Sequence, residues 1–399
     1  MAPPTELILT LNAGSSSIKF AAFPADPAEG RAAFRGAFDG IGVKPGFKVQ
    51  DGEGALIDAF IWDRPDALGG HAGALSHLMA WLERFEGAGT VRAVGHRIVH
   101  GGTAYAEPVA LTPDVLDGLR ALEPLAPLHQ PYNLAGIEAA LAAFPEAVQV
   151  GCFDTAFHRA HPWVNDTFAL PRRFYEAGVR RYGFHGLSYE FIVSHLRAAA
   201  PAAASGRLIA CHLGNGASMC AIKAGQSIGS TMGFSALDGL PMGTRCGQID
   251  PGVLLYLMGQ QGLSVDEVQT LLYRESGLKG LSGLTSDMRD LETSKDPQAA
   301  DAIDYFVFRI KRELGAMAAV LGGVDAIAFA GGIGENSSLI RERVCAEFGW
   351  LGVTLDTAAN QSGAAVISRS GGPVTVHVVK TNEEAVIARH CRALLANRL

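Results

Sequence analysis

Two stretches of this chain share one layout, in which an apolar strand, a short polar tip and a second apolar strand follow one another. The first covers residues 7–23, with its tip at residues 12–17, and the second covers residues 208–222, with its tip at residues 214–218. Each has the pattern of a β-hairpin whose tip is rich in Gly, Ser and Asn. The repetition predicts two duplicated halves.

The segments that follow each hairpin alternate between helical and strand patterns. An apolar stripe at Leu75, Leu78 and Leu82 predicts a helix, and residues 91–99 follow as a strand. Further predicted elements are a helix opened by Thr112 and Pro113, a helix over 131–144, a strand over 147–153, a helix capped by Ser188, a helix over 299–321, and a strand over 326–330 that breaks at the turn 331–336 and restarts as a helix near Ser337. This alternation predicts an α/β fold with a largely parallel sheet and an antiparallel edge.

Length and charge limit the class of protein. A chain of 399 residues exceeds the roughly 250 to 300 residues that one hydrophobic core supports, so we expect two domains. Hydrophobic residues at 48% and charged residues at 18% are typical of a chain that folds throughout. The net charge of −7, without any cluster of Lys and Arg, argues against nucleic acid or an anionic membrane as a partner.

The N-terminal residues and the cysteines indicate the cellular compartment of the protein. The first residues carry no basic segment, and the apolar run after them is broken by Asn12 and Gly14, so we expect no signal peptide and no membrane span. The six cysteines are scattered and include no Cys-x-x-Cys pair. We predict reduced, mostly buried thiols in a cytoplasmic protein.

Glycine-rich turns are the candidates for binding phosphate. The chain has no P-loop motif and no Gly-x-Gly-x-x-Gly between a strand and a helix, which excludes a Walker-type NTPase and a Rossmann dehydrogenase. Small residues at the hairpin tips would let backbone N–H groups reach phosphate oxygens, with Ser hydroxyls and a Lys as further donors. A single tip is more often an ordinary turn. Two related tips and the third turn at 331–336 together favour a nucleotide site.

Several polar side chains contrast with their surroundings. Arg97 interrupts an apolar strand and therefore needs an anion, either a bound ligand or a structural salt-bridge partner, and the sequence leaves both open. His96 and His100 lie near it on the same strand, where their spacing does not suit a metal, so we expect packing or hydrogen bonding. Arg245 and His185 lie on glycine-flanked loops, where functional residues concentrate.

Two adjacent glutamates follow the last strand pattern. Thr381 and Glu384 have the spacing of a capping box, which predicts that they open the C-terminal helix. That interpretation leaves Glu383 without a structural role. A carboxylate and an amide oxygen at strand ends suit Mg²⁺, a hard ion that keeps several waters.

Collectively these residues resemble the acetate kinase family, of the acetate and sugar kinase, Hsp70 and actin superfamily. The shared motifs span nearly the whole chain in the family's order. They are Asn12-x-Gly-Ser-Ser-Ser-x-Lys19, Gly95-His-Arg97, Asp154-Thr-Ala-Phe-His158, Gly183-Phe-His185-Gly, His212-Leu-Gly-Asn-Gly216, Pro241-Met-Gly-Thr-Arg245-Cys-Gly, Asp287-Met-Arg289, Gly332-Ile-Gly-Glu-Asn336 and Thr381-Asn-Glu-Glu384.

The resemblance implies a phosphotransferase with a carboxyl group as acceptor, which interconverts ATP plus acetate with ADP plus acetyl phosphate by direct in-line transfer. It implies Mg²⁺ as cofactor, with Mn²⁺ as a substitute, and a homodimer. The implied fold is a pair of duplicated βββαβαβα domains of the actin-like, ribonuclease H-like type, with an interdomain cleft. The N-terminal domain would cover 1–155 and 386–399, so that the C-terminal helix returns to it, and the nucleotide-binding domain would cover 156–385.

The resemblance also implies roles for single positions. Asn12 and Glu383 fall at the metal positions, and Asp154, His185 and Arg245 at the catalytic positions. The implied substrate positions are Arg97, Val99, Leu128, Phe184 and Ala236. The implied nucleotide positions are Lys19, His212, Leu213, Gly214, Asn215, Gly216, Asp287, Met288, Arg289, Gly332, Ile333, Gly334, Glu335 and Asn336.

The implied chemistry is consistent with these residue types. A carboxylic acid with a pKa of about 4 to 5 is already ionised at neutral pH and needs no general base, so the difficulty is repulsion between anions. Fixed cations and Mg²⁺ can spread the charge of an in-line transition state. We therefore interpret Asp154 as a residue that orients an arginine, the metal or water, and not as a proton acceptor.

Substrate choice depends on one departure from the family pattern. Ala236 stands where the family has proline, which enlarges the acyl pocket toward propionate, whereas Val99 keeps the bulk that favours acetate. One methylene is worth only about 1 to 3 kcal/mol of discrimination. We expect acetate as the preferred substrate and propionate as a secondary one. Gln130, Leu187 and Tyr189 also depart from common family choices, and no function is attached to them.

Two rival hypotheses come from other classes. An ATPase switch of the Hsp70 or actin type would use the same nucleotide site but needs a partner-binding appendage, and motifs reaching from Asn12 to Glu384 leave no length for one. It would also give Arg97, His185 and Arg245 no purpose. A catalytically inactive nucleotide-binding module is disfavoured because every implied catalytic position holds the family residue.

Overall fold

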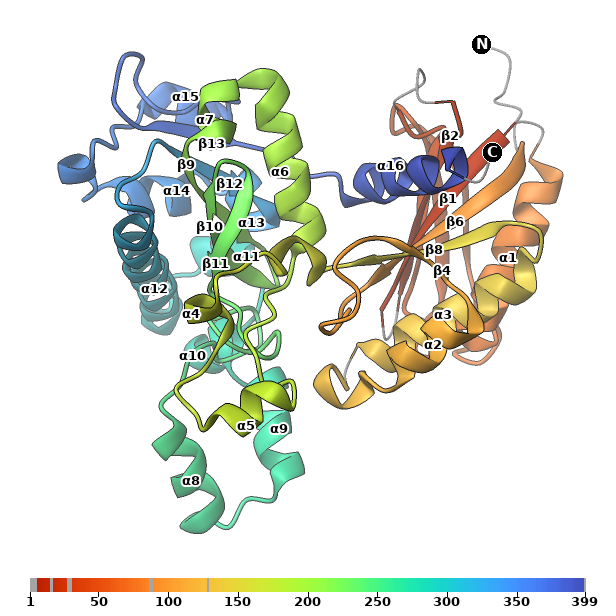
Figure 1. Ribbon diagram of the computed structural model, residues 1–399, viewed down its shortest axis with the longest axis horizontal. Helices are drawn as coiled ribbons and strands as arrows, with labels where there is room; N and C mark the ends of the chain where they lie inside the picture. Colours follow the sequence, from red (N-terminus) through yellow and green to blue (C-terminus); the bar gives the residue numbers. More distant parts are fainter. Residues whose placement is uncertain (1–5, 15–16, 27–30, 86–88, 128, 398–399) are drawn as a thin grey trace. The chain divides into compact units, whose positions relative to one another are not determined.

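The computed structural model describes the chain as two compact units. Unit 1 comprises residues 1–156 and 382–399, and unit 2 comprises residues 157–381. Each unit is built on a sheet of its own (Figure 1). No helix among the described residues combines the length and the apolar character needed to cross a membrane. The described residues are 6–14, 17–26, 31–85, 89–127 and 129–397.

Unit 1 contains an eight-stranded sheet in the order β5-β4-β3-β2-β1-β6-β8-β7. Strands β1 to β5 are antiparallel neighbours, β6 and β8 continue parallel to β1, and β7 pairs antiparallel with β8. The strands are β1 (Glu6–Ala13), β2 (Ile18–Pro24), β3 (Phe34–Asp39), β4 (Gly46–Asp51), β5 (Leu56–Ile61), β6 (Thr90–Ile98), β7 (Val109–Ala110) and β8 (Val148–Phe153). The helices are α1 (Gly70–Arg84), α2 (Pro113–Arg120), η1 (Glu123–Leu125), α3 (Gln130–Ala143) and α16 (Glu383–Ala396).

Helices cover both faces of the central strands of unit 1. Helix α16 packs on β1, β6 and β8, and α1 and α3 lie on the opposite face (Figure 1). Gly95 in β6 lets α16 approach closely, because a Cβ at this position would lie 2.3 Å from Ile387 Cγ2. On the other face Leu9 and Leu11 share one core cluster with Leu78 of α1. Burial on both faces explains the nearly continuous apolar run of β1.

Unit 2 contains a five-stranded sheet in the order β11-β10-β9-β12-β13. Strands β9 to β11 are antiparallel neighbours, and β12 and β13 continue parallel to β9. The strands are β9 (Arg207–Leu213), β10 (Ala217–Lys223), β11 (Gln226–Ser230), β12 (Ala326–Ala330) and β13 (Thr375–Val378). The helices, after η2 (Ala156–His158) at the junction, are α4 (Trp163–Asp166), α5 (Arg172–Glu176), α6 (Gly186–Ala199), α7 (Pro201–Ser205), α8 (Pro251–Gly259), α9 (Val265–Arg274), α10 (Gly277–Ser282), α11 (Met288–Thr293), α12 (Pro297–Leu321), α13 (Gly331–Asn336), α14 (Ser338–Cys345), η3 (Gly349–Leu351) and α15 (Thr357–Ser362).

The two sheets share one strand arrangement. The order β3-β2-β1-β6-β8 in unit 1 corresponds to β11-β10-β9-β12-β13 in unit 2, with the same antiparallel and parallel pairings. This correspondence confirms the predicted α/β fold with duplicated halves. The edge strands β4, β5 and β7 extend only the first sheet. All six cysteines are free, and only Cys246 among them is not fully buried.

Two predicted helix starts are wrong. Ser188 does not cap α6: the N-cap is His185, and the Ser188 hydroxyl bonds instead to His212 Nδ1 at 2.7 Å. Thr381 and Glu384 do not form a capping box, because the Asn382 side chain caps α16 by accepting from the Ala385 N–H at 3.0 Å. The turn at 331–336 is itself helical and forms α13. The predicted cap at Thr112 is confirmed, since its hydroxyl accepts from the backbone of α2.

Candidate active site

Arg97 forms the centre of a charged cluster in unit 1. Its guanidinium donates to both carboxylate oxygens of Asp154, with Nη2–Oδ2 at 2.7 Å and Nε–Oδ1 at 3.0 Å, and its Nη1 lies 3.3 Å from Glu383 Oε2. Arg97 comes from the end of β6 and Asp154 follows the parallel neighbour β8, so both side chains lie at the carboxyl edge of the sheet. Ligands of open α/β sheets bind at this edge.

Electrostatics keep the Arg97 guanidinium charged. Burial alone would lower the pKa of Arg97, but the Asp154 and Glu383 carboxylates more than offset that effect, and the pKa is raised. The Arg97 side chain is 20% exposed and that of Asp154 only 3%. The two-point bond to Asp154 fixes the plane of the guanidinium. Such a group can bind a further carboxylate from solvent without reorienting.

Asn133, which the sequence reasoning missed, connects the end of β6 to the end of β1. Its Oδ1 accepts from the Val99 N–H at 3.0 Å, and its Nδ2 donates to the Ala13 carbonyl at 2.9 Å. His71 also bonds to this segment, with Nε2 at 2.7 Å from the Gly14 carbonyl. No sequence signal pointed to either residue, because both are polar side chains on otherwise ordinary helical patterns.

The two implied metal positions both lie in unit 1. Asn12 is at the carboxyl end of β1, and Glu383 is the first residue of α16, which packs on β1. The described residues contain no group of three or more His, Cys, Asp and Glu side chains that could hold an ion by themselves. An amide and a carboxylate oxygen are hard ligands that suit Mg²⁺, which usually takes one or two carboxylates and completes its shell with water and substrate phosphates.

Unit 2 contains a pocket of about 690 Å³, which is large enough for a nucleotide. It is formed where the tip between β9 and β10, the start of α11 and the turn α13 meet. The lining residues are Gly214, Asn215, Ser286, Asp287, Met288, Arg289, Glu292, Gly332, Ile333, Asn336 and Ser337. Three separate motifs of the implied nucleotide site therefore meet at one pocket.

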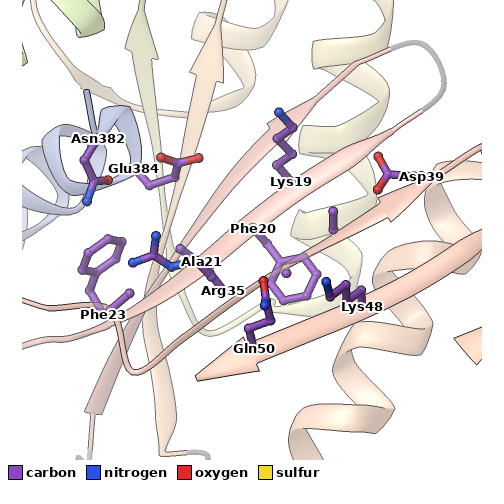
Figure 2. Close-up of a pocket in the computed structure, with 13 residues that line it drawn as sticks. Lys19, Phe20, Ala21, Phe23, Arg35, Asp39, Lys48, Gln50, Asn382 and Glu384 are labelled. Carbon is purple, nitrogen blue, oxygen red and sulfur yellow. The ribbon is translucent and has the colours of Figure 1, made fainter. Parts of the chain in front are cut away.

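Other implied nucleotide residues do not line that pocket. The Glu335 carboxylate accepts instead from the Gly331 N–H at 3.0 Å and from the Thr381 N–H at 3.1 Å, so it holds the α13 turn in place. His212, Leu213, Gly216 and Gly334 belong to the same turns but stand outside the lining. Lys19 lies on β2 of unit 1, where its exposed side chain lines a pocket of about 250 Å³ (Figure 2).

Asp287 and Arg289 shape one wall of the pocket in unit 2. The Asp287 carboxylate caps α11 by accepting from the Arg289 N–H at 2.9 Å, and it pairs with the Arg289 guanidinium at 2.5 Å. The side-chain hydrogen bond from Arg289, with the backbone one second, lowers the pKa of Asp287 to about 2. The Arg289 side chain is 88% exposed and so can bind a phosphate or base from solvent.

His185 and Arg245 approach the same part of unit 2 from two loops. The His185 ring stacks on that of His212 at 4.3 Å between centroids, and its Nδ1 lies 2.8 Å from Ser218 Oγ. Arg245 donates from Nη1 to the Ala236 carbonyl at 2.9 Å. The Arg245 loop is joined to the tip between β9 and β10 by a bond from the Gly243 N–H to the Asn215 carbonyl at 3.1 Å.

The implied acyl-pocket residues are divided between the units. Val99 is partly buried in unit 1, and Leu128 lies outside the described residues. Phe184 is fully buried in unit 2, and Ala236 is partly buried there. The predicted hydrogen-bonding roles of the two strand histidines are confirmed: His96 Nε2 lies 2.7 Å from Gln149 Oε1, and His100 Nδ1 accepts from the Gly102 N–H at 2.9 Å.

Comparison with known proteins identifies the family. The Acetokinase family model matches residues 7–389. An acetate kinase of Methylocella silvestris is 56% identical, over 97% of this chain and 98% of its own. The crystal structure of Porphyromonas gingivalis acetate kinase superposes with a TM-score of 0.88 at 36% identity, covering 98% of this chain and 100% of the other. A propionate kinase from Francisella tularensis gives a TM-score of 0.90 at 32% identity, with 96% and 98% covered. This chain belongs to the acetokinase family.

Proposed function

We propose that this protein transfers the γ-phosphoryl group of ATP to acetate, giving acetyl phosphate and ADP, and that it catalyses the reverse reaction. The observation that carries the proposal is the meeting of three nucleotide motifs at one pocket of unit 2, in a chain whose unit 1 presents a partly buried arginine at the carboxyl edge of its sheet. The identity of 56% to a protein named acetate kinase, over 97% of this chain, supports the same reaction.

Arg97 is the proposed partner of the acetate carboxylate. Asp154 stabilises the charged form of Arg97. Its two-point bond also sets the direction of the remaining guanidinium N–H groups. Asp154 therefore acts through Arg97 and needs no proton transfer of its own. Acetate attacks as the anion, so the reaction requires no general base, and its barrier is the repulsion between acetate and the phosphate oxygens.

The proposed nucleotide site uses backbone N–H groups of the glycine tips for the phosphates and the exposed Arg289 for the outer part of the nucleotide. Arg245 and His185 are proposed to stabilise the three equatorial oxygens of the phosphoryl group during in-line transfer. Both lie on loops joined to the nucleotide tip by hydrogen bonds or ring stacking. Lys19 is proposed to add a further positive charge.

Asn12 and Glu383 are proposed to hold Mg²⁺, with Mn²⁺ as a substitute. The ion supplies neutralisation of phosphate charge when it is bound. Glu383 is the carboxylate that binds Arg97 through a single contact at 3.3 Å, so it remains available to a second cation. Asn12 adds a neutral oxygen, which is consistent with an ion that keeps most of its water.

Acetate is the proposed main substrate, with propionate as the second candidate. The specific observation that favours propionate is Ala236, which is smaller than the proline of the family pattern and only partly buried. Val99, which is partly buried just after β6, keeps the bulk that favours acetate. The likeness to a propionate kinase structure is compatible with activity on both acids.

We also propose a homodimer in the cytoplasm. Helix α8 supports the dimer, because none of its residues is buried although most are apolar. Leu255 is 74% exposed and Tyr256 is 53% exposed. Exposed apolar surface of this density on a folded protein marks an interaction site.

A hydroxamate assay tests the proposed reaction. The purified protein is incubated with ATP, Mg²⁺ and hydroxylamine, with acetate, propionate, butyrate or no acid. Hydroxamate that depends on acetate supports the kinase, and the ratio of kcat/KM for acetate and propionate sets the substrate order. ATP hydrolysis that is independent of the acid would instead indicate the ATPase switch, and no turnover of any kind would indicate an inactive module.

A further inference from the structure

The backbone at His185 adopts a conformation that side chains rarely take. Among described residues other than glycine, only His185 and Ala224 have a positive φ, which is 58° at His185. Such a conformation is strained and persists only where the surroundings hold it. Strained backbone of this kind is found more often at functional sites than elsewhere.

A buried hydrogen-bond network around His158 fixes the loop that carries His185. His158 Nε2 lies 2.9 Å from the Phe184 carbonyl, which can only accept, so this nitrogen carries the proton. Burial lowers the pKa of His158 to about 4, so the ring is neutral and its Nδ1 accepts from Ser227 Oγ at 2.8 Å. Gly183, with φ of 74°, packs directly on the His158 ring, and any Cβ would lie 2.6 Å from it. The peptide before His185 is therefore fixed.

A second network determines the proton position on the His185 ring. Tyr189 and Ser218 are both 0% exposed, and the Tyr189 hydroxyl lies 2.5 Å from Ser218 Oγ. Burial raises the pKa of Tyr189 well above its ordinary value, so the hydroxyl keeps its proton and must donate it. A buried donor that is left unsatisfied destabilises the fold. Ser218 Oγ therefore accepts from Tyr189.

The Ser218 hydroxyl has one proton of its own, and it too is buried. Its other bond is to His185 Nδ1 at 2.8 Å. Donation along this bond makes Nδ1 of His185 an acceptor, which leaves the ring proton of the neutral imidazole on Nε2. Nε2 faces Gly216 of the nucleotide tip, because a Cβ built on Gly216 would lie 3.2 Å from it. The chain of bonds thus directs an N–H toward that tip.

The stacked ring of His212 disfavours a state in which both rings are charged. Its centroid is 4.3 Å from that of His185, with 25° between the planes, and its Nδ1 bonds to Ser188 Oγ at 2.7 Å. Two like charges this close together repel each other strongly at the effective dielectric of a protein. Both rings cannot be cationic without that penalty.

We propose that Tyr189 and Ser218 are positioning residues that hold His185 as the neutral tautomer with its proton on Nε2, so that His185 stabilises the transferring phosphoryl group as an uncharged hydrogen-bond donor. This inference rests on the proposed kinase function. Under this proposal, Arg245 supplies positive charge in unit 2 and His185 supplies a directed N–H. It also gives a role to Tyr189, one of the departures from common family choices.

Packing alone is the competing explanation. The Tyr189 ring lies edge-on to the His158 ring at 5.6 Å and near that of Phe157 at 6.2 Å. Tyr189→Phe keeps all of this packing and removes only the hydroxyl. Ser218→Ala removes the hydroxyl that bonds to His185, and Ser218→Thr restores one. The three variants therefore separate the hydrogen-bond chain from the ring contacts.

The test combines the tautomer of His185 with kinetics. Protein labelled with ¹⁵N-histidine is measured by long-range ¹H–¹⁵N correlation at pH 7, and the His185 signals are assigned by their loss in His185→Gln. We expect a protonated Nε2 in the unchanged protein and a mixture of tautomers in Tyr189→Phe and Ser218→Ala. We expect kcat to fall about tenfold in Tyr189→Phe and about 100-fold in Ser218→Ala, with KM for acetate unchanged, since removing a direct transition-state donor costs about 10²–10³ in kcat.

Each outcome of this test supports or contradicts the positioning of His185 by Tyr189 and Ser218. Recovery of both the tautomer and kcat in Ser218→Thr supports positioning. A proton on Nδ1, or a doubly protonated ring, in the unchanged protein overturns the proposal, as does a change of tautomer without a change of kcat. Thermal unfolding shows whether each variant is folded, and Tyr189→Phe is informative even if Ser218→Ala is not. If the unchanged protein makes no acetyl phosphate although its tautomer is as expected, the proposed function fails while the ring geometry stands.

Discussion

At the scale of single residues, Arg97 has the structural salt bridge that is one of its two interpretations, while a bound anionic ligand stays a proposal. It has a structural partner in Asp154, through two hydrogen bonds, and it lies at the sheet edge where ligands bind. The sequence showed that Arg97 needs an anion but not which one, because Asp154 and Glu383 come from distant segments. The same holds for His185 and Arg245, whose loops were evident while their partners Ser218 and Ala236 were not.

Arg97→Lys tests the acetate-binding role. Lysine keeps the positive charge that Asp154 and Glu383 require, so the fold should survive, but it cannot bond to two carboxylates in one plane. We expect KM for acetate to rise by about 10- to 100-fold, equivalent to about 1.4 to 2.8 kcal/mol, with KM for ATP unchanged. Steady-state kinetics with each substrate varied in turn gives both constants. Arg120→Lys, at the exposed pair with Glu138, is the matched control. An unchanged KM for acetate in Arg97→Lys would contradict the role.

At the scale of elements, local patterns predicted the hairpins, the central strands and the long helices, because their hydrophobic periods are complete within each segment. Strands β3, β4, β5 and β7 were missed. Strand β5 is exposed at nearly every position and so lacks an apolar face. The start of α16 was misjudged for another reason. Thr381 and Asn382 both have the chemistry of an N-cap, and Thr381 is taken by a tertiary bond to Glu335 that no local pattern contains.

The cap of α16 can be measured directly. Asn382→Ala removes the acceptor of the Ala385 N–H, so we expect a loss of about 1 kcal/mol in the free energy of unfolding. Glu384→Ala should change it by less than about 0.5 kcal/mol, because Glu384 is not part of a capping box. Urea unfolding followed by circular dichroism measures both variants. A larger loss of unfolding free energy in Glu384→Ala than in Asn382→Ala would contradict Asn382 as the N-cap and would support a capping box that includes Glu384.

At the scale of the whole molecule, buried histidines in both units couple stability to pH. Burial lowers the pKa of His96 to about 4 and that of His158 to about 4, from 6.5 in the unfolded chain. As pH falls below 6.5 the unfolded chain binds these protons first, so stability is full above 6.5 and is lost toward pH 4. Each histidine contributes a slope of at most about 1.4 kcal/mol per pH unit.

Urea unfolding at several pH values between 7 and 4.5 tests this coupling. We expect the free energy of unfolding to fall throughout that range in the unchanged protein. His96→Gln removes one titrating group and keeps a polar side chain near Gln149, so the dependence on pH should weaken by about one proton. The same pH dependence in His96→Gln and the unchanged protein would show that His96 is not protonated on unfolding.

The association of whole chains depends on surface that folding leaves apolar. Helix α8 is capped by Asp250 and forms a regular helix, yet none of its residues is fully buried and most of its apolar side chains stay exposed. In the proposed homodimer, a second copy of the chain would cover them.

Leu255→Asp tests this proposed interface. The substitution places a charge on the helix at no cost to the core, and we expect the proposed dimer to dissociate to monomers. Trp350→Asp is the matched control, because Trp350 is 74% exposed, as is Leu255. Light scattering after size-exclusion chromatography gives the mass of each variant. A dimer that persists in Leu255→Asp, or a dimer lost in Trp350→Asp alone, would place the interface elsewhere.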